Sequence, residues 1–173
     1  PLGAAFGSAL AIENEMIVVG APGTVNGLGS GAVYLFSRES GMWLQEQKLE
    51  SDTLTDGDML GSALAIHEGT IVAGAPGYDA GGMTNSGLVI IFEESAGTWT
   101  ESLSISANNP SPFASFGFSI DVDQDRLLVG APGENVETGA AYLHTRLANM
   151  WIDQVKMEPL VPEEGGLFGA DVG

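Results

Sequence analysis

The chain has 173 residues and a formal net charge of −18, from 23 acidic and 5 basic side chains. Such an acidic surface repels phosphate groups, and no apolar run approaches the roughly 18 residues that span a bilayer, so we expect neither a nucleic-acid partner nor membrane insertion. The lack of cysteine excludes disulfides and thiolate chemistry, while 25 glycines, 8 prolines and many short apolar runs favour an all-β domain rich in turns.

The first repeated element is a short apolar run that ends at Gly-Ala-Pro-Gly. It occurs three times, at residues 17–23, 71–77 and 127–133. Proline fixes φ and removes a backbone donor, so strand pairing cannot continue past it, and Pro-Gly suits the centre of a type II turn. Three copies at nearly constant spacing predict a repeat architecture.

Three further landmarks accompany each run. They are a Phe-Gly or Leu-Gly pair (6–7, 60–61, 116–117 and 168–169), a glycine that opens a second apolar run (Gly31, Gly87 and Gly139) and a lone tryptophan (Trp43, Trp99 and Trp151). Most spacings are constant: 13 residues from the pair to Gly-Ala-Pro, 12 from the opening glycine to tryptophan, and 18 from tryptophan to the next pair. Only the segment from Gly-Ala-Pro to the opening glycine varies, at 11, 13 and 9 residues. Length variation is therefore confined to one loop per repeat.

Four strands per repeat fit these landmarks. We expect first strands at 8–12, 62–66 and 119–122, second strands at 17–19, 71–73 and 127–129, third strands at 31–36, 87–92 and 139–143, and fourth strands that begin at each tryptophan. Small residues dominate the first strand, large apolar residues the second and third, and polar residues the fourth, which is the order expected of a propeller blade from axis to rim. The sequence predicts an all-β fold of β-propeller-type repeats, with three complete four-stranded blades and the start of a fourth.

The Phe-Gly and Gly-Ala-Pro landmarks resemble FG-GAP repeats, the units of integrin α-subunit-type β-propellers, although Leu60 replaces Phe in the second copy. The resemblance covers residues 1–173 as one repeat region, with repeats at about 6–59, 60–115 and 116–167 and a partial fourth at 168–173. It implies extracellular blades, secreted or on a cell surface, that serve adhesion and recognition. Such propellers have about seven blades, so three blades imply part of a longer chain, or a stacked or open array.

Two acidic clusters are candidates for cation binding. The resemblance implies an Asp-rich calcium loop between the first and second strands, and in the third repeat Asp121, Asp123 and Asp125 occupy that place. Calcium needs six to eight oxygens and a turn glycine, and this segment is no longer than its two counterparts, so a solvated hairpin is the alternative. The second cluster is Asp52, Asp56 and Asp58, for which we expect a turn. No other cofactor is expected.

The variable loops are the candidate binding segments, at 24–30, 78–86 and 134–138. The candidate residues in them are Thr24, Asn26, Tyr78, Asp79, Asn85, Glu134 and Asn135. Because strands alternate in direction, these loops and the links between repeats should emerge at one end of the sheets. Loops on a rigid scaffold commonly carry binding, although neutral surface insertion is the alternative.

The aromatic landmarks have a structural interpretation. The identical setting of the three tryptophans favours packing between blades over a carbohydrate-stacking set. The Phe-Gly aromatics should lie in the core, with glycine allowing close approach of two backbones. His67 and His144 occupy unrelated positions in their repeats, and no nucleophile elbow, metal-binding helix or Walker loop occurs, so we expect no enzyme activity.

The sequence leaves three hypotheses for function. The first is a non-enzymatic extracellular or cell-surface adhesion and recognition module that binds a protein or glycan ligand. The second is a structural building block of an extracellular filament or sheath, whose partners are copies of itself or neighbouring repeats. The third is an accessory domain of a secreted enzyme.

Overall fold

The computed structural model describes residues 4–23, 29–148 and 150–173, without the side chain of Asp153. In this part of the chain, twelve strands form three four-stranded antiparallel sheets, which we call blades 1, 2 and 3. Blade 1 contains β1 (Leu10–Glu13), β2 (Met16–Ala21), β3 (Ala32–Glu39) and β4 (Met42–Leu49); blade 2 contains β5 (Leu64–His67), β6 (Thr70–Ala75), β7 (Leu88–Ser95) and β8 (Thr98–Ile105); blade 3 contains β9 (Ser119–Asp123), β10 (Arg126–Ala131), β11 (Ala140–Leu147) and β12 (Met150–Met157). The predicted all-β, blade-type architecture is confirmed.

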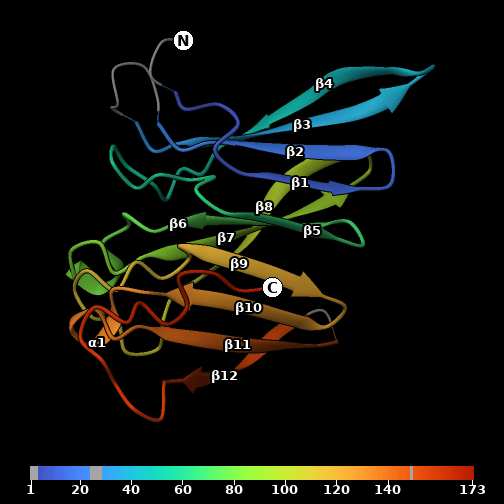
Figure 1. Cartoon of the computed structure of the whole chain (residues 1–173). Helices are drawn as coiled ribbons and strands as arrows, with labels where there is room; N and C mark the ends of the chain where they lie inside the picture. The colour runs from blue at the N-terminus through green and yellow to red at the C-terminus, as the bar shows by residue number, and fades with distance from the viewer. Residues whose placement is uncertain (1–3, 24–28, 149) are drawn as a thin grey trace.

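Each blade follows the chain from its first strand to its fourth, and the first strands of the three blades lie next to one another. Figure 1 shows this arrangement, with β1, β5 and β9 in succession and β4 and β12 farther out. The predicted first strands in blades 1 and 2 begin two residues too early, and the third strands extend beyond the predicted ends. The first two strands of each blade are joined by a two-residue turn, because Glu13 pairs with Met16, His67 with Thr70 and Asp123 with Arg126.

The hydrophobic core lies between blades. At the first interface, between blades 1 and 2, Val18, Val33 and Leu35 of blade 1 pack in one cluster with Ile71 and Phe92 of blade 2. The second interface, between blades 2 and 3, repeats the arrangement. There, Val72, Val89 and Ile91 of blade 2 share a cluster with Leu127, Val129 and Tyr142 of blade 3. Blade 2 therefore has a neighbouring blade on each side, which explains why its second and third strands carry buried apolar residues on both faces.

The glycine landmarks join one repeat to the next. A Cβ atom added to Gly20 would collide with the carbonyl oxygen of Gly61. Gly74 approaches Gly117 in the same way. Bridges between Gly31 and Leu60, Gly87 and Phe116, and Gly139 and Phe168 also connect successive repeats. Glycine is required here because the two backbones come closer than any side chain allows, as the sequence predicted for the Phe-Gly pairs.

The prediction that the Phe-Gly aromatics are core residues is correct for one of the three phenylalanines, Phe116, and Leu60, which replaces phenylalanine in the second pair, is also a core residue. Leu60 and Phe116 are fully buried, whereas Phe6 and Phe168 are exposed. The exposed pair lies on the two outer faces of the three-blade stack, where no blade of the described residues covers it. In the same described part of the chain, no helix combines the length and apolar character needed to cross a membrane.

Candidate recognition surface at the variable-loop end

The variable loops and the links between blades lie at the same end of the sheets, as predicted. Hydrogen bonds connect them directly: Gly57 N–H donates to Gly29 O at 3.1 Å, Phe113 N–H to Thr84 O at 2.7 Å, and Leu167 N–H to Glu137 O at 3.0 Å. In each case a residue of the link that leads to the next repeat donates to a residue of the variable loop of the same repeat. Each described loop is therefore supported by the segment that starts the next blade, and the three loop regions form one end of the molecule.

The first loop is described only from Gly29 onward. Thr24 and Asn26, two of the candidate binding residues, lie outside the described residues. The residue before the loop is hydrogen-bonded to the segment that precedes β1, since Gly23 N–H donates to Ala4 O at 3.1 Å.

The second loop forms a compact turn around a short helix, η2 (Ala80–Gly82). Asp79 accepts a hydrogen bond from Asn85 N–H at 2.8 Å, and the buried hydroxyl of Ser86 accepts one from Ala80 N–H at 2.9 Å. Tyr78 is half-buried and packs against the core of the first interface. The structure thus brings the three candidate residues together, namely Tyr78, Asp79 and Asn85. Tyr78 and Asp79 stabilise the conformation of the loop through these contacts. Residues 81–85 are exposed to solvent.

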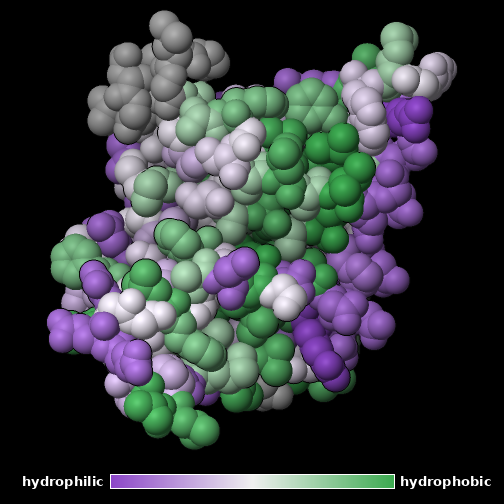
Figure 2. Space-filling model, in the orientation of Figure 1, coloured by the Kyte–Doolittle hydropathy of each residue, from purple (hydrophilic) through white to green (hydrophobic). Residues whose placement is uncertain are grey.

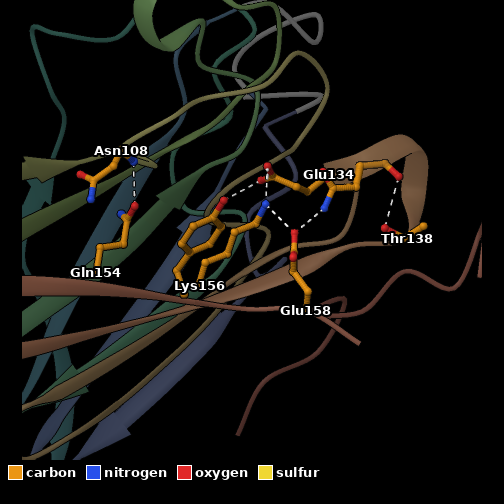
Figure 3. A network of polar contacts seen from close by, with 8 residues as sticks. Asn108, Glu134, Thr138, Gln154, Lys156 and Glu158 are labelled. Carbon is orange, nitrogen blue, oxygen red and sulfur yellow. Dashed lines mark hydrogen bonds and ion pairs between the residues drawn. The ribbon is translucent and has the colours of Figure 1, made fainter. Parts of the chain in front are cut away.

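The third loop is held by a buried carboxylate (Figure 3). Glu134 is almost completely buried and accepts hydrogen bonds from the Tyr142 hydroxyl at 2.8 Å and from Lys156 Nζ at 3.1 Å. Lys156 also contacts Glu158 at 2.7 Å, and Glu158 accepts from the Asn135 amide at 2.6 Å. A buried charge needs such partners, so this network fixes the loop on β11 and β12.

The network shifts the pKa of its members in consistent directions. Burial and the hydrogen bond to Glu134 raise the pKa of Tyr142 above its ordinary value. Burial lowers the pKa of Lys156, but hydrogen bonds to Glu158 and Glu134 outweigh this and raise it overall. The hydrogen bonds from Lys156 and Asn135 lower the pKa of Glu158. Tyrosine therefore stays neutral and lysine charged at physiological pH, which keeps the network intact.

The tip of the third loop has an unusual backbone. In α1 (Glu134–Glu137), Asn135, Val136 and Glu137 have φ values of 52°, 59° and 62°. This left-handed region is unfavourable for a β-branched residue, so Val136 is strained. Its apolar side chain is also 75% exposed. Strain of this kind persists only where surrounding contacts enforce it, and the Glu134 network supplies those contacts.

The opposite end of the sheets carries the candidate calcium residues. Asp121 and Asp123 lie in β9, and Asp125 lies in the two-residue turn that follows. Among the described residues, no group of three or more His, Asp or Glu side chains could hold a metal ion. Calcium at these three aspartates stays a prediction to which the geometry adds no support. In the second cluster, Asp58 is buried and accepts a hydrogen bond from Thr55 N–H at 2.6 Å. This hydrogen bond stabilises the turn that the sequence predicts here.

The tryptophans pack between blades where a preceding blade exists. Trp99 is buried in the first interface, and Trp151 packs at the second. Trp43 occupies the corresponding position on the outer face of blade 1 and is 40% exposed. The structural interpretation therefore holds for Trp99 and Trp151, while Trp43 has no neighbouring blade among the described residues.

A groove of about 400 Å³ lies beside Trp151, between the rims of blades 2 and 3. Ile105 and Asn108 line one side, and His144, Trp151 and Gln154 the other. The Gln154 amide oxygen accepts a hydrogen bond from Asn108 N–H at 2.7 Å, as Figure 3 shows.

Sequence reasoning missed both this groove and the Glu134 network, since their members come from separate repeats or from positions that do not recur. The scarcity of basic residues was the one usable signal for Lys156.

Three blades with adjacent first strands, Gly-to-Gly contacts and variable loops at one end define a repeat protein of the β-propeller type. The sequence profile of the FG-GAP repeat family matches residues 3–36, 43–92 and 99–144. These segments include most of the sequence, and the chain belongs to the FG-GAP repeat family.

A solved structure supports the fold. A europium-containing methanol dehydrogenase, which is a β-propeller, is similar over 90% of this chain with a TM-score of 0.55. The chain spans 26% of that protein and is 11% identical to it, so the similarity shows the fold alone. No curated protein matches the chain by sequence.

Proposed function

We propose that the chain is a non-enzymatic recognition module of an extracellular protein, secreted or on a cell surface, and that its variable-loop end binds a protein or glycan ligand. One observation carries the proposal: loops of different length and backbone geometry gather at one end of a frame whose other spacings are constant. Rigid presentation lowers the entropic cost of binding, and each described loop is held by its own polar contacts.

The chemistry of the loops suits such a ligand. The second loop exposes glycines, Met83 and Thr84, and the third exposes Val136 beside polar Asn135 and Glu137. A mixture of apolar and hydrogen-bonding groups is typical of surfaces that bind proteins or glycans. Membership of the FG-GAP family and the strongly acidic composition are consistent with an extracellular protein.

Loop exchange tests the proposal. The chain should be screened against immobilised extracellular-matrix proteins and a glycan array, and residues 81–84 should then be replaced by a Gly-Ser segment of equal length. We expect loss of binding with an unchanged melting temperature, since these residues are exposed and Asp79, Asn85 and Ser86 remain in place. The matched control exchanges the exposed turn Asn14-Glu15 at the other end of the sheets. Equal binding by both variants and the wild type would contradict the proposal.

Val136 offers a narrower test. Substitution Val136→Gly removes the apolar side chain and relieves left-handed strain, so it should raise stability by about 1 kcal/mol while it weakens ligand binding. A matched Leu147→Gly change removes an exposed apolar side chain in β11, away from the loop end, and should leave binding unchanged. If Val136→Gly binds like the wild type, the third loop does not contribute to recognition.

A structural building block of a filament is the second candidate. It rests on the exposed apolar residues of blade 1, which include Phe6, Leu10 and Ile12. Electron microscopy of the concentrated chain should then show fibres, and a monodisperse monomer would contradict this function.

A further inference from the structure

The groove between the rims of blades 2 and 3, named here the rim groove, has an uncharged lining. One wall is the end of β8 with the link that follows it, and the other is blade 3; its principal residues are Ile105, Ser106, Asn108, His144, Trp151 and Gln154. Among the described lining residues, none is Asp, Glu, Lys or Arg. Strongly hydrophilic side chains are common elsewhere, as the border of the view in Figure 2 shows, and the whole chain has a net charge of −18. An uncharged groove in such a surface favours a ligand without charge.

The first interface carries different side chains at the matching positions. Counted from the tryptophan or the opening glycine of each repeat, the replacements from the first interface to the second are Glu50 to Ser106, Asp52 to Asn108, Phe92 to His144 and Ser102 to Gln154. The rim groove therefore lacks two carboxylates and gains two amides and an imidazole. Amide, hydroxyl and neutral imidazole groups can each both donate and accept hydrogen bonds. These groups suit a ligand whose own polar groups do the same, and hydroxyls are such groups.

Gln154 fixes the wall that the link provides. Its amide oxygen accepts a hydrogen bond from Asn108 N–H at 2.7 Å, as Figure 3 shows, and its amide nitrogen donates to the Ser106 carbonyl oxygen at 3.1 Å. Both contacts use backbone groups of the link, so they leave the Ser106 hydroxyl and the Asn108 amide available to a ligand. Asn108 is exposed and Ser106 is half-buried. Polar side chains on a wall that is already held in place lose little conformational freedom on binding.

The opposite wall adds a neutral ring and an apolar surface. His144 is almost completely buried, and its Nε2 lies 3.3 Å from the amide nitrogen of Gln154. Burial lowers the pKa of His144 to about 4, so the imidazole is uncharged at physiological pH. Trp151 is half-buried, in contrast to the buried Trp99, and its indole N–H has no hydrogen-bond partner in the described part of the chain. With Ile105 on the other wall, Trp151 provides apolar surface inside the groove.

A sugar ring combines C–H groups that pack on apolar side chains with hydroxyls that donate and accept. The groove volume of about 400 Å³ lies within the range of small-molecule sites, about 300–1,000 Å³. We propose that the rim groove binds a neutral saccharide, with its ring against Ile105 and Trp151 and its hydroxyls bonded to Ser106 and Asn108. None of the described lining residues belongs to a variable loop, so this site is separate from the recognition surface proposed above.

Saturation-transfer difference NMR of the whole chain tests the proposal. The probes are D-glucose, D-galactose, D-mannose, lactose and cellobiose, and we expect at least one to bind with a Kd on the order of 1 mM, as a small ligand with few contacts should. Glucuronate, galacturonate and mannuronate carry the same rings with a carboxylate. They should bind about tenfold more weakly than the matching neutral sugar at low ionic strength, since the described lining offers no cation. The proposal is overturned if no neutral sugar binds, or if the uronates bind equally well.

Side-chain variants place the sugar in the groove. Asn108→Ala keeps the backbone N–H that donates to Gln154, and it should weaken sugar binding by about 2–10-fold through the loss of one hydrogen bond. Its melting temperature should be unchanged, because the Asn108 side chain is exposed. Asn109→Ala is the matched control, since Asn109 is exposed in the same link but does not line the groove, and it should bind like the wild type.

The variable loops provide the last comparison. A Gly-Ser exchange of residues 81–84 should leave sugar binding intact, so the groove and the recognition surface can fail independently of each other. The groove is overturned as the site if Asn108→Ala binds sugar like the wild type, or if the loop exchange abolishes sugar binding while Asn108→Ala does not weaken it.

Discussion

The two interfaces share a backbone arrangement but differ in the side chains that fill them. Both are joined by a Gly-to-Gly contact and a parallel bridge at the start of the next repeat. The first interface is apolar around Phe92, and Gln47 of β4 is hydrogen-bonded to both the N–H and the C=O of Trp99. The second contains His144 in place of that phenylalanine, together with the cross-blade pair of Arg146 and Glu93.

This difference shows which part of the repeat tolerates change. Backbone contacts at the glycines leave no room for any side chain, so they are the same at both interfaces. The space between the sheets is filled by side chains, and either a phenylalanine or a histidine can fill it. The histidine needs hydrogen-bond partners for its ring nitrogens. Substitutions at the glycines, at the tryptophans and at His144 should therefore differ in their cost.

Truncation of a buried tryptophan should have the largest effect. Trp99→Ala leaves a cavity in the first interface and should lower the free energy of unfolding by about 3–5 kcal/mol. Trp43→Ala, at the same position of blade 1 but on its exposed outer face, should cost about 1 kcal/mol or less. Urea denaturation of both variants measures the difference. Equal losses would show that the tryptophans do not act through contact between blades.

Substitution of an interface glycine should cost nearly as much. Gly74→Ala places a Cβ atom against the carbonyl oxygen of Gly117, and we expect a loss of about 3 kcal/mol from overpacking. Gly20→Ala should cost a similar amount, because its contact with Gly61 is of the same kind. Gly97→Ala is the control: it has a positive φ but open space, and should cost about 1–2 kcal/mol. If Gly74→Ala is no worse than Gly97→Ala, the backbone contact is not a constraint.

The second interface should be sensitive to pH. Burial lowers the pKa of His144 from 6.5 to about 4, so between these values the unfolded chain binds a proton that the folded chain does not. The stabilisation is therefore complete above pH 6.5 and is lost as the pH falls toward 4, by up to about 3 kcal/mol. His144→Phe, which introduces the residue found at the matching Phe36 and Phe92, removes this contribution. The free energy of unfolding of the wild type and of the variant should be measured between pH 4 and pH 6.5. The carboxylates titrate alike in the two proteins, so their contribution cancels in the difference. A difference that does not vary with pH would contradict the prediction.

The cross-blade ion pair should have the smallest effect. Arg146 and Glu93 are both partly exposed, so Arg146→Met should cost about 0.5–1 kcal/mol and less at high salt. Arg38→Met provides the comparison, because the Arg38 guanidinium makes a longer contact, to the Glu15 carboxylate at 3.7 Å. Thermal unfolding at low and high salt measures both. A loss for Arg146→Met that is unchanged by salt would indicate packing against Trp151, whose ring lies 5.7 Å from the guanidinium, as the source of stability.

Local chemistry was sufficient to predict much of this protein from its sequence. Constant spacings identified the repeats, and the Gly-Ala-Pro turns marked the ends of β2, β6 and β10. Strand alternation placed the variable loops and the links at one end. These features depend on turn geometry, apolar runs and chain direction, all of which are properties of neighbouring residues.

Tertiary structure decided what depends on neighbours in space. Phe6 and Phe116 belong to the same motif, yet Phe6 is exposed and Phe116 is buried, because among the described residues a preceding blade lies beside Phe116 and none lies beside Phe6. Glu134 lies in a variable loop and is a candidate binding residue by sequence. In the structure it is buried, because the pairing of β11 with β12 places Tyr142 and Lys156 side by side, where both donate hydrogen bonds to it. Burial and charge pairing are set by the register of distant strands, and for that reason the repeat itself was determined by the sequence while the environment of each copy was determined by the fold.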